Sequence, residues 1–199
     1  MEFIEDMAAL EALYDSPAPA SLTKVVARIT PLYRRWIEAS RFCVLTSVGS
    51  EGTDGSPRGD DGPVVRIADD KTLLLPDWRG NNRIDSLRNI VRDGRVSLMF
   101  MVPGSMNVVR VNGTAKLTAD PAMTTQFEHR GKHPKTVITI VVEEMYFQCA
   151  KAIMRAGLWS RDDSEGLPTA GQFVQEMKAD FDADSYDSGY AEYAKGRMW

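Results

Sequence analysis

The chain has 199 residues, of which 43% are hydrophobic and 26% are charged, and its formal net charge is −4. This length and apolar content suit one domain, or one domain with a helical extension, and can bury a core of ordinary size. The mildly acidic balance argues against a general nucleic-acid binder, which needs a dense basic face.

Residues 1–40 predict an N-terminal helical extension. Apolar residues in the segment 7–14 indicate a short opening helix. Ser21 is a predicted cap for a second helix, in which apolar side chains between Leu22 and Ile29 share one face. Thr30 followed by Pro31 is typical of a cap and a first-turn proline, and predicts a third helix.

Residues 41–160 predict a β-rich domain. Its β-prone runs are residues 42–46, 64–67, 72–75, 96–102, 109–117 and 136–147. Turn-rich segments such as Gly49–Gly55 separate runs of this kind. We expect a mainly β fold with helices, in the α+β class, in which about six strands form an antiparallel barrel.

Two helices are expected to interrupt these strands. One begins near Asn82, after a polar loop, and carries apolar residues on one face. The other begins at Asp120, which is followed by a first-turn proline, and continues to about Arg130.

Residues 161–199 form the predicted C-terminal region, which follows a short helix at 150–156. This region is expected to contain a helix around 170–179. The tail from Asp180 to Trp199 is rich in Asp, Tyr and Gly, and we expect it to have little order.

The polar loop between a predicted strand, which ends at Asp77, and the helix that follows carries the clearest chemical signal. Free N–H groups and a partial positive charge at a helix N-terminus favour a phosphate. Arg79 and Arg83 add charge-assisted donors, while Asn81 and Asn82 add neutral donors and can cap the helix. The loop therefore predicts a site for a phosphate monoester. The alternative is an ordinary surface loop with solvated arginines.

Arg58 is a second unusual residue, because it lies where a strand is expected. An arginine at an inward-facing strand position is costly unless it has an anion or a polar ligand. Ser56 lies two residues away and so shares its face of the strand. The alternative is a loop arginine that pairs with Asp60 or Asp61.

Other common catalytic and metal-binding patterns are absent from the sequence. It contains no Gly-x-Gly-x-x-Gly that opens a helix, no P-loop and no nucleophile elbow. His129 and His133 are four residues apart, but no third ligand is evident, so no metal site is expected. Cys43 and Cys149 lie in apolar surroundings and are expected to be buried small hydrophobes.

No segment of the sequence predicts a membrane span or a secretory signal. No apolar run reaches the roughly 18 residues that a span needs. Residues 1–10 carry three acids and no basic residue, unlike a secretory signal. We therefore expect a cytoplasmic protein with no membrane partner and no nucleic-acid partner.

A series of short motifs resembles a known family. The motifs are Ser56–Asp60 (Ser-Pro-Arg-Gly-Asp), Leu73–Asp77 (Leu-Leu-Leu-Pro-Asp), Arg79–Arg83 (Arg-Gly-Asn-Asn-Arg), Arg95–Phe100 (Arg-Val-Ser-Leu-Met-Phe) and Arg110–Ala115 (Arg-Val-Asn-Gly-Thr-Ala). Their order resembles that in pyridoxamine 5′-phosphate oxidase-related FMN-binding proteins, and most closely the bacterial subgroup of about two hundred residues. The resemblance extends over residues 35–159 and implies a six-stranded antiparallel split β-barrel.

The resemblance also implies FMN as cofactor. In such proteins the loop between strand and helix holds the FMN phosphate. The residues that occupy this loop or directly precede it are Arg79, Asn81, Asn82 and Arg83. Ser56 and Arg58 match the strand that passes the ribityl chain and the flavin ring.

A homodimer is the third implication of the resemblance. In these dimers the flavin sites lie at the subunit interface, and the second subunit closes each site. Trp159 resembles the segment that reaches across, and is expected near the partner's flavin. Lys151 and Arg155 are weaker candidates for the same role.

Two departures from true pyridoxamine 5′-phosphate oxidases restrict the expected activity. The chain has Asn-Asn-Arg where the oxidases have Ser-Arg-Lys, and it lacks their Arg-Leu-x-Pro ending. We therefore expect an FMN-dependent oxidoreductase that acts on a different small molecule, with no catalytic side chain identified. The alternatives are a non-catalytic flavin carrier or sensor, and a deazaflavin-dependent reductase.

Overall fold

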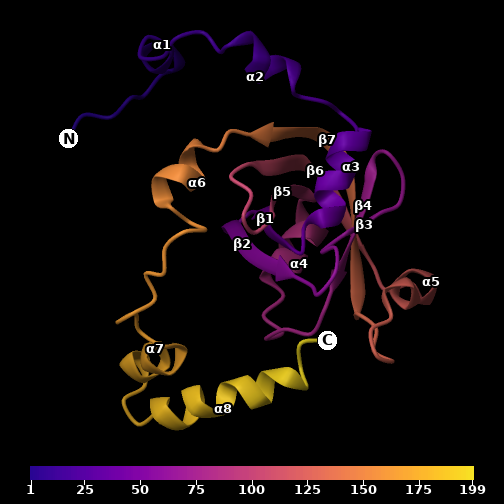
Figure 1. Cartoon of the computed structure of the whole chain (residues 1–199), viewed down its shortest axis with the longest axis vertical. Coiled ribbons are helices and arrows are strands. Elements are labelled where there is room, and N and C mark those ends of the chain that lie inside the picture. Colours follow the sequence, from indigo (N-terminus) through magenta and orange to yellow (C-terminus); the bar gives the residue numbers. More distant parts are fainter.

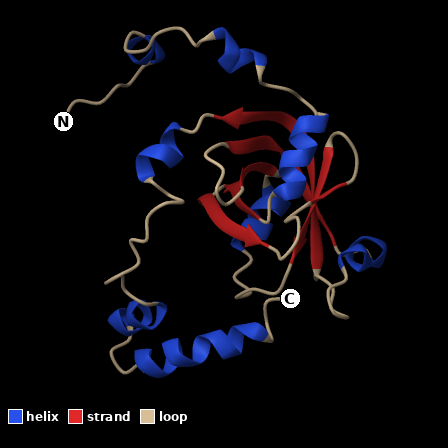
Figure 2. Cartoon of the chain, in the orientation of Figure 1, coloured by secondary structure: helices blue, strands red, loops and turns tan.

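The computed structural model describes residues 1–199 as an antiparallel sheet with helices at both ends of the chain (Figures 1 and 2). The seven strands lie in the order β2-β1-β5-β6-β7-β4-β3, and every pairing is antiparallel. Their bounds are β1 Phe42–Gly49, β2 Gly52–Gly59, β3 Arg66–Ile67, β4 Thr72–Asp77, β5 Arg95–Met101, β6 Val108–Thr118 and β7 Thr136–Gln148. The predicted α+β class is confirmed. The sheet has seven strands instead of about six, because β2 joins the strands that match the six β-prone runs.

The long strand β7 pairs with two neighbours and joins β4 to the rest of the sheet. Its 13 residues pair with β6 along most of their length and with β4 over residues 136–141. Buried and partly exposed side chains alternate along β1 and β5, and the core contains Leu45, Leu98, Phe100 and Ile140, all with 0% exposure. No ladder joins β2 to β3 or β4, so the barrel stays open between these strands.

A β-bulge lies in the middle of β6, where the register with β7 shifts between Asn112 and Gly113. An ideal Cβ built on Gly113 would lie 2.0 Å from the carbonyl oxygen of Val141. Only glycine therefore fits this position without a displacement of the β7 backbone.

We expect Gly113→Ala to lower the free energy of unfolding by about 2 kcal/mol, the cost typical of overpacking in a tight site. Urea denaturation of the variant measures this loss. Gly55→Ala serves as the control, because a Cβ at Gly55 would meet nothing within 4 Å. Equal stability of the two variants would contradict the role assigned to Gly113.

The helices that pack on the barrel are α3 Pro31–Ala39, α4 Asp85–Arg92 and α5 Pro121–Thr124. Ile37 of α3 is completely buried, and Leu87 and Ile90 of α4 belong to the same core. The helix predicted from Asp120 to about Arg130 is shorter in the structure: α5 is followed by a 3-10 turn, Thr125–Phe127, and Glu128 is extended. None of the helices is both long and apolar enough to cross a membrane.

The N-terminal region contains α1 Met7–Glu11 and α2 Pro19–Thr23 (Figure 1). The predicted helix from Ser21 through Ile29 is wrong, because α2 begins at Pro19 and ends at Thr23. Val26 instead forms a β-bridge with Met145 through two backbone hydrogen bonds of 3.0 and 2.7 Å. Pairing with the end of the sheet therefore prevails over the local helical pattern.

The C-terminal region contains α6 Lys151–Ala156, α7 Ala170–Met177 and α8 Ala183–Lys195. The prediction of little order after Asp180 is wrong, since α8 is a 13-residue helix whose N-cap, Asp182, accepts a hydrogen bond from the Ser185 N–H at 2.9 Å. Helix α8 packs on α7 where Gly171 allows close approach, and the Gly171 N–H donates to Asp187. Beyond α8 the chain end returns toward the barrel (Figure 1).

Candidate functional site

A cleft of about 1020 Å³ lies at the opening of the barrel. Its walls are β2, the end of β4, the loop of residues 78–84 and the start of α4. Six of the residues singled out from the sequence line it together: Ser56, Arg58, Arg79, Asn81, Asn82 and Arg83. The volume is at the upper end of the roughly 300–1,000 Å³ that is typical of small-molecule sites.

Arg58 and Asp77 form an ion pair of 2.6 Å that joins β2 to the end of β4 across the barrel opening. Their side chains are only 17% and 19% exposed. The alternative in which Arg58 pairs with Asp60 or Asp61 is therefore wrong. The Arg58 Nε atom is buried and has no hydrogen-bond partner, so one donor of this guanidinium is unused.

The loop that precedes α4 contains two residues with left-handed backbone conformation. Asn81 accepts a hydrogen bond from the Arg83 N–H at 3.0 Å, and Asn82 and Ile84 have left-handed φ angles of 61° and 55°. The helix consequently begins at Asp85, three residues after the predicted start, and neither asparagine caps it. A left-handed β-branched residue such as Ile84 costs about 1–3 kcal/mol, which the surrounding structure must offset.

The positive charge that this part of the cleft offers to an anion comes more from arginine and lysine side chains than from the N-terminus of α4. Asp85 already places a carboxylate in the first turn of α4 and pairs with the Arg83 Nε at 2.8 Å. The Arg83 side chain is 76% exposed. Arg79 and Lys135, which also line the cleft, make neither an ion pair nor a side-chain hydrogen bond, so both cations are available to an anion.

Aromatic residues at the mouth of the cleft were not identified from the sequence. Trp78 and Trp199 donate from their Nε1 atoms to the two carboxylate oxygens of Asp60, at 2.8 and 3.4 Å. The Trp199 ring stacks on His129 with a centroid distance of 4.2 Å. These residues are far apart in the chain, and no sequence pattern links Trp199 to the loop at Trp78.

The two histidines do not form a metal centre in the structure. His129 is half-buried against Trp199, whereas His133 lines the cleft. No group of three or more His, Cys, Asp or Glu side chains is arranged to hold a metal ion.

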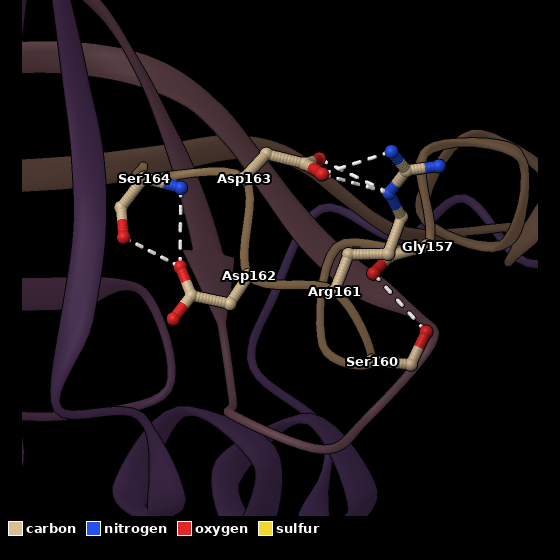
Figure 3. A network of polar contacts seen from close by, with 6 residues as sticks. All are labelled: Gly157, Ser160, Arg161, Asp162, Asp163 and Ser164. Carbon is tan, nitrogen blue, oxygen red and sulfur yellow. Dashed lines mark hydrogen bonds and ion pairs between the residues drawn. The ribbon is translucent and has the colours of Figure 1, made fainter. Parts of the chain in front are cut away.

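Trp159 lies outside this cleft, after the C-cap of α6. Its Nε1 donates to the backbone oxygen of Ser105 at 2.7 Å. The chain that follows is held by local polar contacts, in which Arg161 pairs with Asp163 at 2.8 Å and Asp162 accepts from Ser164 (Figure 3). Lys151 and Arg155 are exposed on α6 and do not line the cleft either. A role of these residues in a partner's site stays a prediction.

A family model described as pyridoxamine 5′-phosphate oxidase matches residues 29–149, which is more than half of the chain. The chain belongs to the pyridoxamine 5′-phosphate oxidase family. The resemblance found in the short motifs is therefore confirmed. No curated protein matches this family member.

Solved structures similar to this member of the pyridoxamine 5′-phosphate oxidase family have low sequence identity. HupZ from Group A Streptococcus is 22% identical, with a TM-score of 0.49 over 59% of this chain and 91% of that chain. A candidate pyridoxamine 5′-phosphate oxidase from Lactobacillus delbrueckii is 19% identical, with a TM-score of 0.48 over 61% and 95%. An FMN-binding protein from Syntrophomonas wolfei is 15% identical, with a TM-score of 0.41 over 57% and 86%.

The two cysteines of this family member differ in their surroundings. Cys43 faces the core beside Arg58, and burial raises the pKa of its thiol to about 12, although the charge of Arg58 opposes the shift. Cys149 is exposed, so the prediction that both cysteines are buried is wrong for this one. It follows β7, where the chain leaves the sheet.

We expect iodoacetamide at pH 8 to modify Cys149 and to leave Cys43 unmodified in the folded protein, because the thiolate is the nucleophile. Mass spectrometry of tryptic peptides distinguishes the two sites. In urea both cysteines should react. Modification of Cys43 in the folded protein at a rate similar to that of Cys149 would contradict its burial and raised pKa.

Proposed function

We propose that the protein is a flavoprotein that binds FMN in the cleft at the barrel opening, with the cofactor phosphate at the loop of residues 79–83. The observation that carries the proposal is that six residues, identified from their types and spacing in the sequence, line this one cleft. Membership of the pyridoxamine 5′-phosphate oxidase family supports the same cofactor.

The donors present in the cleft fit a phosphorylated flavin. Arg79 has no carboxylate partner and would bind the phosphate together with the Asn82 amide and the Arg83 guanidinium. Ser56 and Arg58 lie on the inward face of β2, where half-buried and exposed residues alternate. Arg58 would face the flavin there, with its unpartnered Nε as a donor and Asp77 holding its guanidinium in place.

The bound flavin would supply hydride and electron transfer, which requires little from the side chains beyond binding and orientation. We infer that the protein is an FMN-dependent oxidoreductase that acts on a small molecule other than pyridoxamine 5′-phosphate. The Asn-Asn-Arg loop, which stands in place of the Ser-Arg-Lys of true pyridoxamine 5′-phosphate oxidases, supports that exclusion. We further propose a cytoplasmic homodimer in which Trp159 of each subunit closes the other subunit's site.

Purification under native conditions, followed by a visible spectrum and a mass of the released cofactor, tests the proposal. We expect the bands of an oxidised flavin and the mass of FMN. A deazaflavin mass, or a colourless protein that does not bind added FMN, would overturn the assignment. Bleaching by NADH or NADPH and recolouring in air would establish turnover, whereas a stable yellow colour would favour a carrier or sensor.

A further inference from the structure

A second cavity, of about 820 Å³, adjoins the cofactor cleft. It lies between helix α8 and the loop proposed to hold the flavin phosphate. The two cavities share Gly59, Asp60, residues 79–82 and the chain end at residues 198 and 199. A ligand in this second cavity would therefore lie close to the phosphate end of a bound flavin.

Helix α8 presents a row of tyrosines to this cavity. Tyr186, Tyr190 and Tyr193 all line it, and their spacing along the helix places them on one face. Neighbouring ring centroids are 6.0 and 6.4 Å apart, and the three residues are 40%, 52% and 57% exposed. A solvated helix face rarely carries three large rings, whereas stacking of a flat aromatic ligand would cover them.

Two arginines and two aspartates line the cavity, and the two arginines are the groups that can bind an anion such as a phosphate. Arg79 and Arg197 line it and make no ion pair; Arg197 lies over the Tyr193 ring at 4.1 Å. The carboxylate of Asp60 already accepts hydrogen bonds from both indoles at its mouth and from the Asp61 N–H. Asp61 adds one exposed carboxylate, which can accept a hydrogen bond from an exocyclic amino group.

We propose that the second cavity binds an adenosine 5′-phosphate group, with the adenine on the tyrosine row and the phosphate between Arg79 and Arg197. The proposal rests on the flavin site described above, because adenosine 5′-phosphate is the group joined to the FMN phosphate in FAD. The same group also occurs in NADH and NADPH. It therefore reaches the cavity either as part of an FAD cofactor or as part of a separate dinucleotide donor.

Calorimetric titrations of the flavin-free protein with AMP, FMN and FAD, and of the FMN-loaded protein with ADP-ribose, test the proposal. We expect AMP to bind the flavin-free protein, and Tyr190→Ala to weaken AMP binding about tenfold, as loss of one stacking partner does. Arg197→Gln should have a similar effect. FMN affinity should be unchanged in both variants. The control is Tyr14→Ala, at an exposed tyrosine outside both cavities, which should change neither the AMP affinity nor the FMN affinity.

The titrations distinguish the two sources of the adenosine 5′-phosphate group, FAD and a separate dinucleotide. If FAD binds at least tenfold more tightly than FMN and Tyr190→Ala removes that difference, the adenosine phosphate belongs to FAD. If ADP-ribose binds the FMN-loaded protein and Tyr190→Ala weakens it, a separate dinucleotide is the source. Absence of AMP and ADP-ribose binding, with FAD no tighter than FMN, would overturn the proposal. Failure of FMN itself to bind would instead count against the proposed function.

Discussion

The double variant Arg79→Ala, Arg83→Ala is expected to bind FMN about 100-fold more weakly than the unchanged protein. A hydrogen bond to a charged group contributes about 1.5–3 kcal/mol, and each 1.4 kcal/mol corresponds to a factor of ten in affinity. Arg79 should account for most of the loss, because Arg83 is 76% exposed and already pairs with Asp85. Quenching of flavin fluorescence on binding measures the dissociation constant.

Riboflavin makes this test specific to the phosphate. It lacks the phosphoryl group, so its affinity should be nearly the same in the double variant and in the unchanged protein. Arg92→Ala is the matched control, since Arg92 is an exposed arginine of α4 that pairs with Glu51 and does not line the cleft. If the double variant lost FMN affinity and riboflavin affinity equally, the two arginines would not act by binding the phosphate.

The second large effect is expected at the ion pair across the barrel opening. Arg58→Ala leaves the Asp77 carboxylate, which is only 19% exposed, without its counterion. Removal of one partner of a buried ion pair costs about 3–5 kcal/mol, and the partial exposure of this pair favours the lower end. We therefore expect a loss of about 3 kcal/mol in the free energy of unfolding, measured by urea denaturation of the flavin-free protein.

A double-mutant cycle with Asp77→Ala isolates the pair from other effects of the substitution. The double variant should be more stable than the sum of the two single losses predicts, because it no longer contains an unpaired charge. Strictly additive losses would show that the two side chains do not stabilise each other. The same variants should also lose flavin affinity if Arg58 faces the ring.

Local sequence patterns predicted much of the cleft. The strand that ends at Asp77 and the polar loop after it follow from hydrophobic runs and turn residues, and both are present in the structure. The alternation that places Ser56 and Arg58 on one face is also present in β2. These features depend on neighbours a few residues away, which is the range that strand and turn patterns report.

Local patterns failed where a distant partner decided the conformation. The pattern from Leu22 to Ile29 has helical spacing, yet the backbone of Val26 pairs with Met145 at the end of β7. The C-terminal tail has a composition typical of weak order, yet α8 forms because it packs on α7 at Gly171. In both cases tertiary contacts contribute more to the stability of the observed conformation than the local sequence preference does.

The sequence by itself therefore determined the fold class, the family and the types of residue that line the cleft. Only the tertiary structure decided which of these side chains already have an ion-pair or hydrogen-bond partner within the protein. It pairs Arg58 with Asp77 and brings Trp199 to Asp60, because the curvature of the sheet brings β2 close to the end of β4 and the chain end folds back onto the opening. Such pairings depend on the curvature of the whole sheet, which no short segment of the chain encodes.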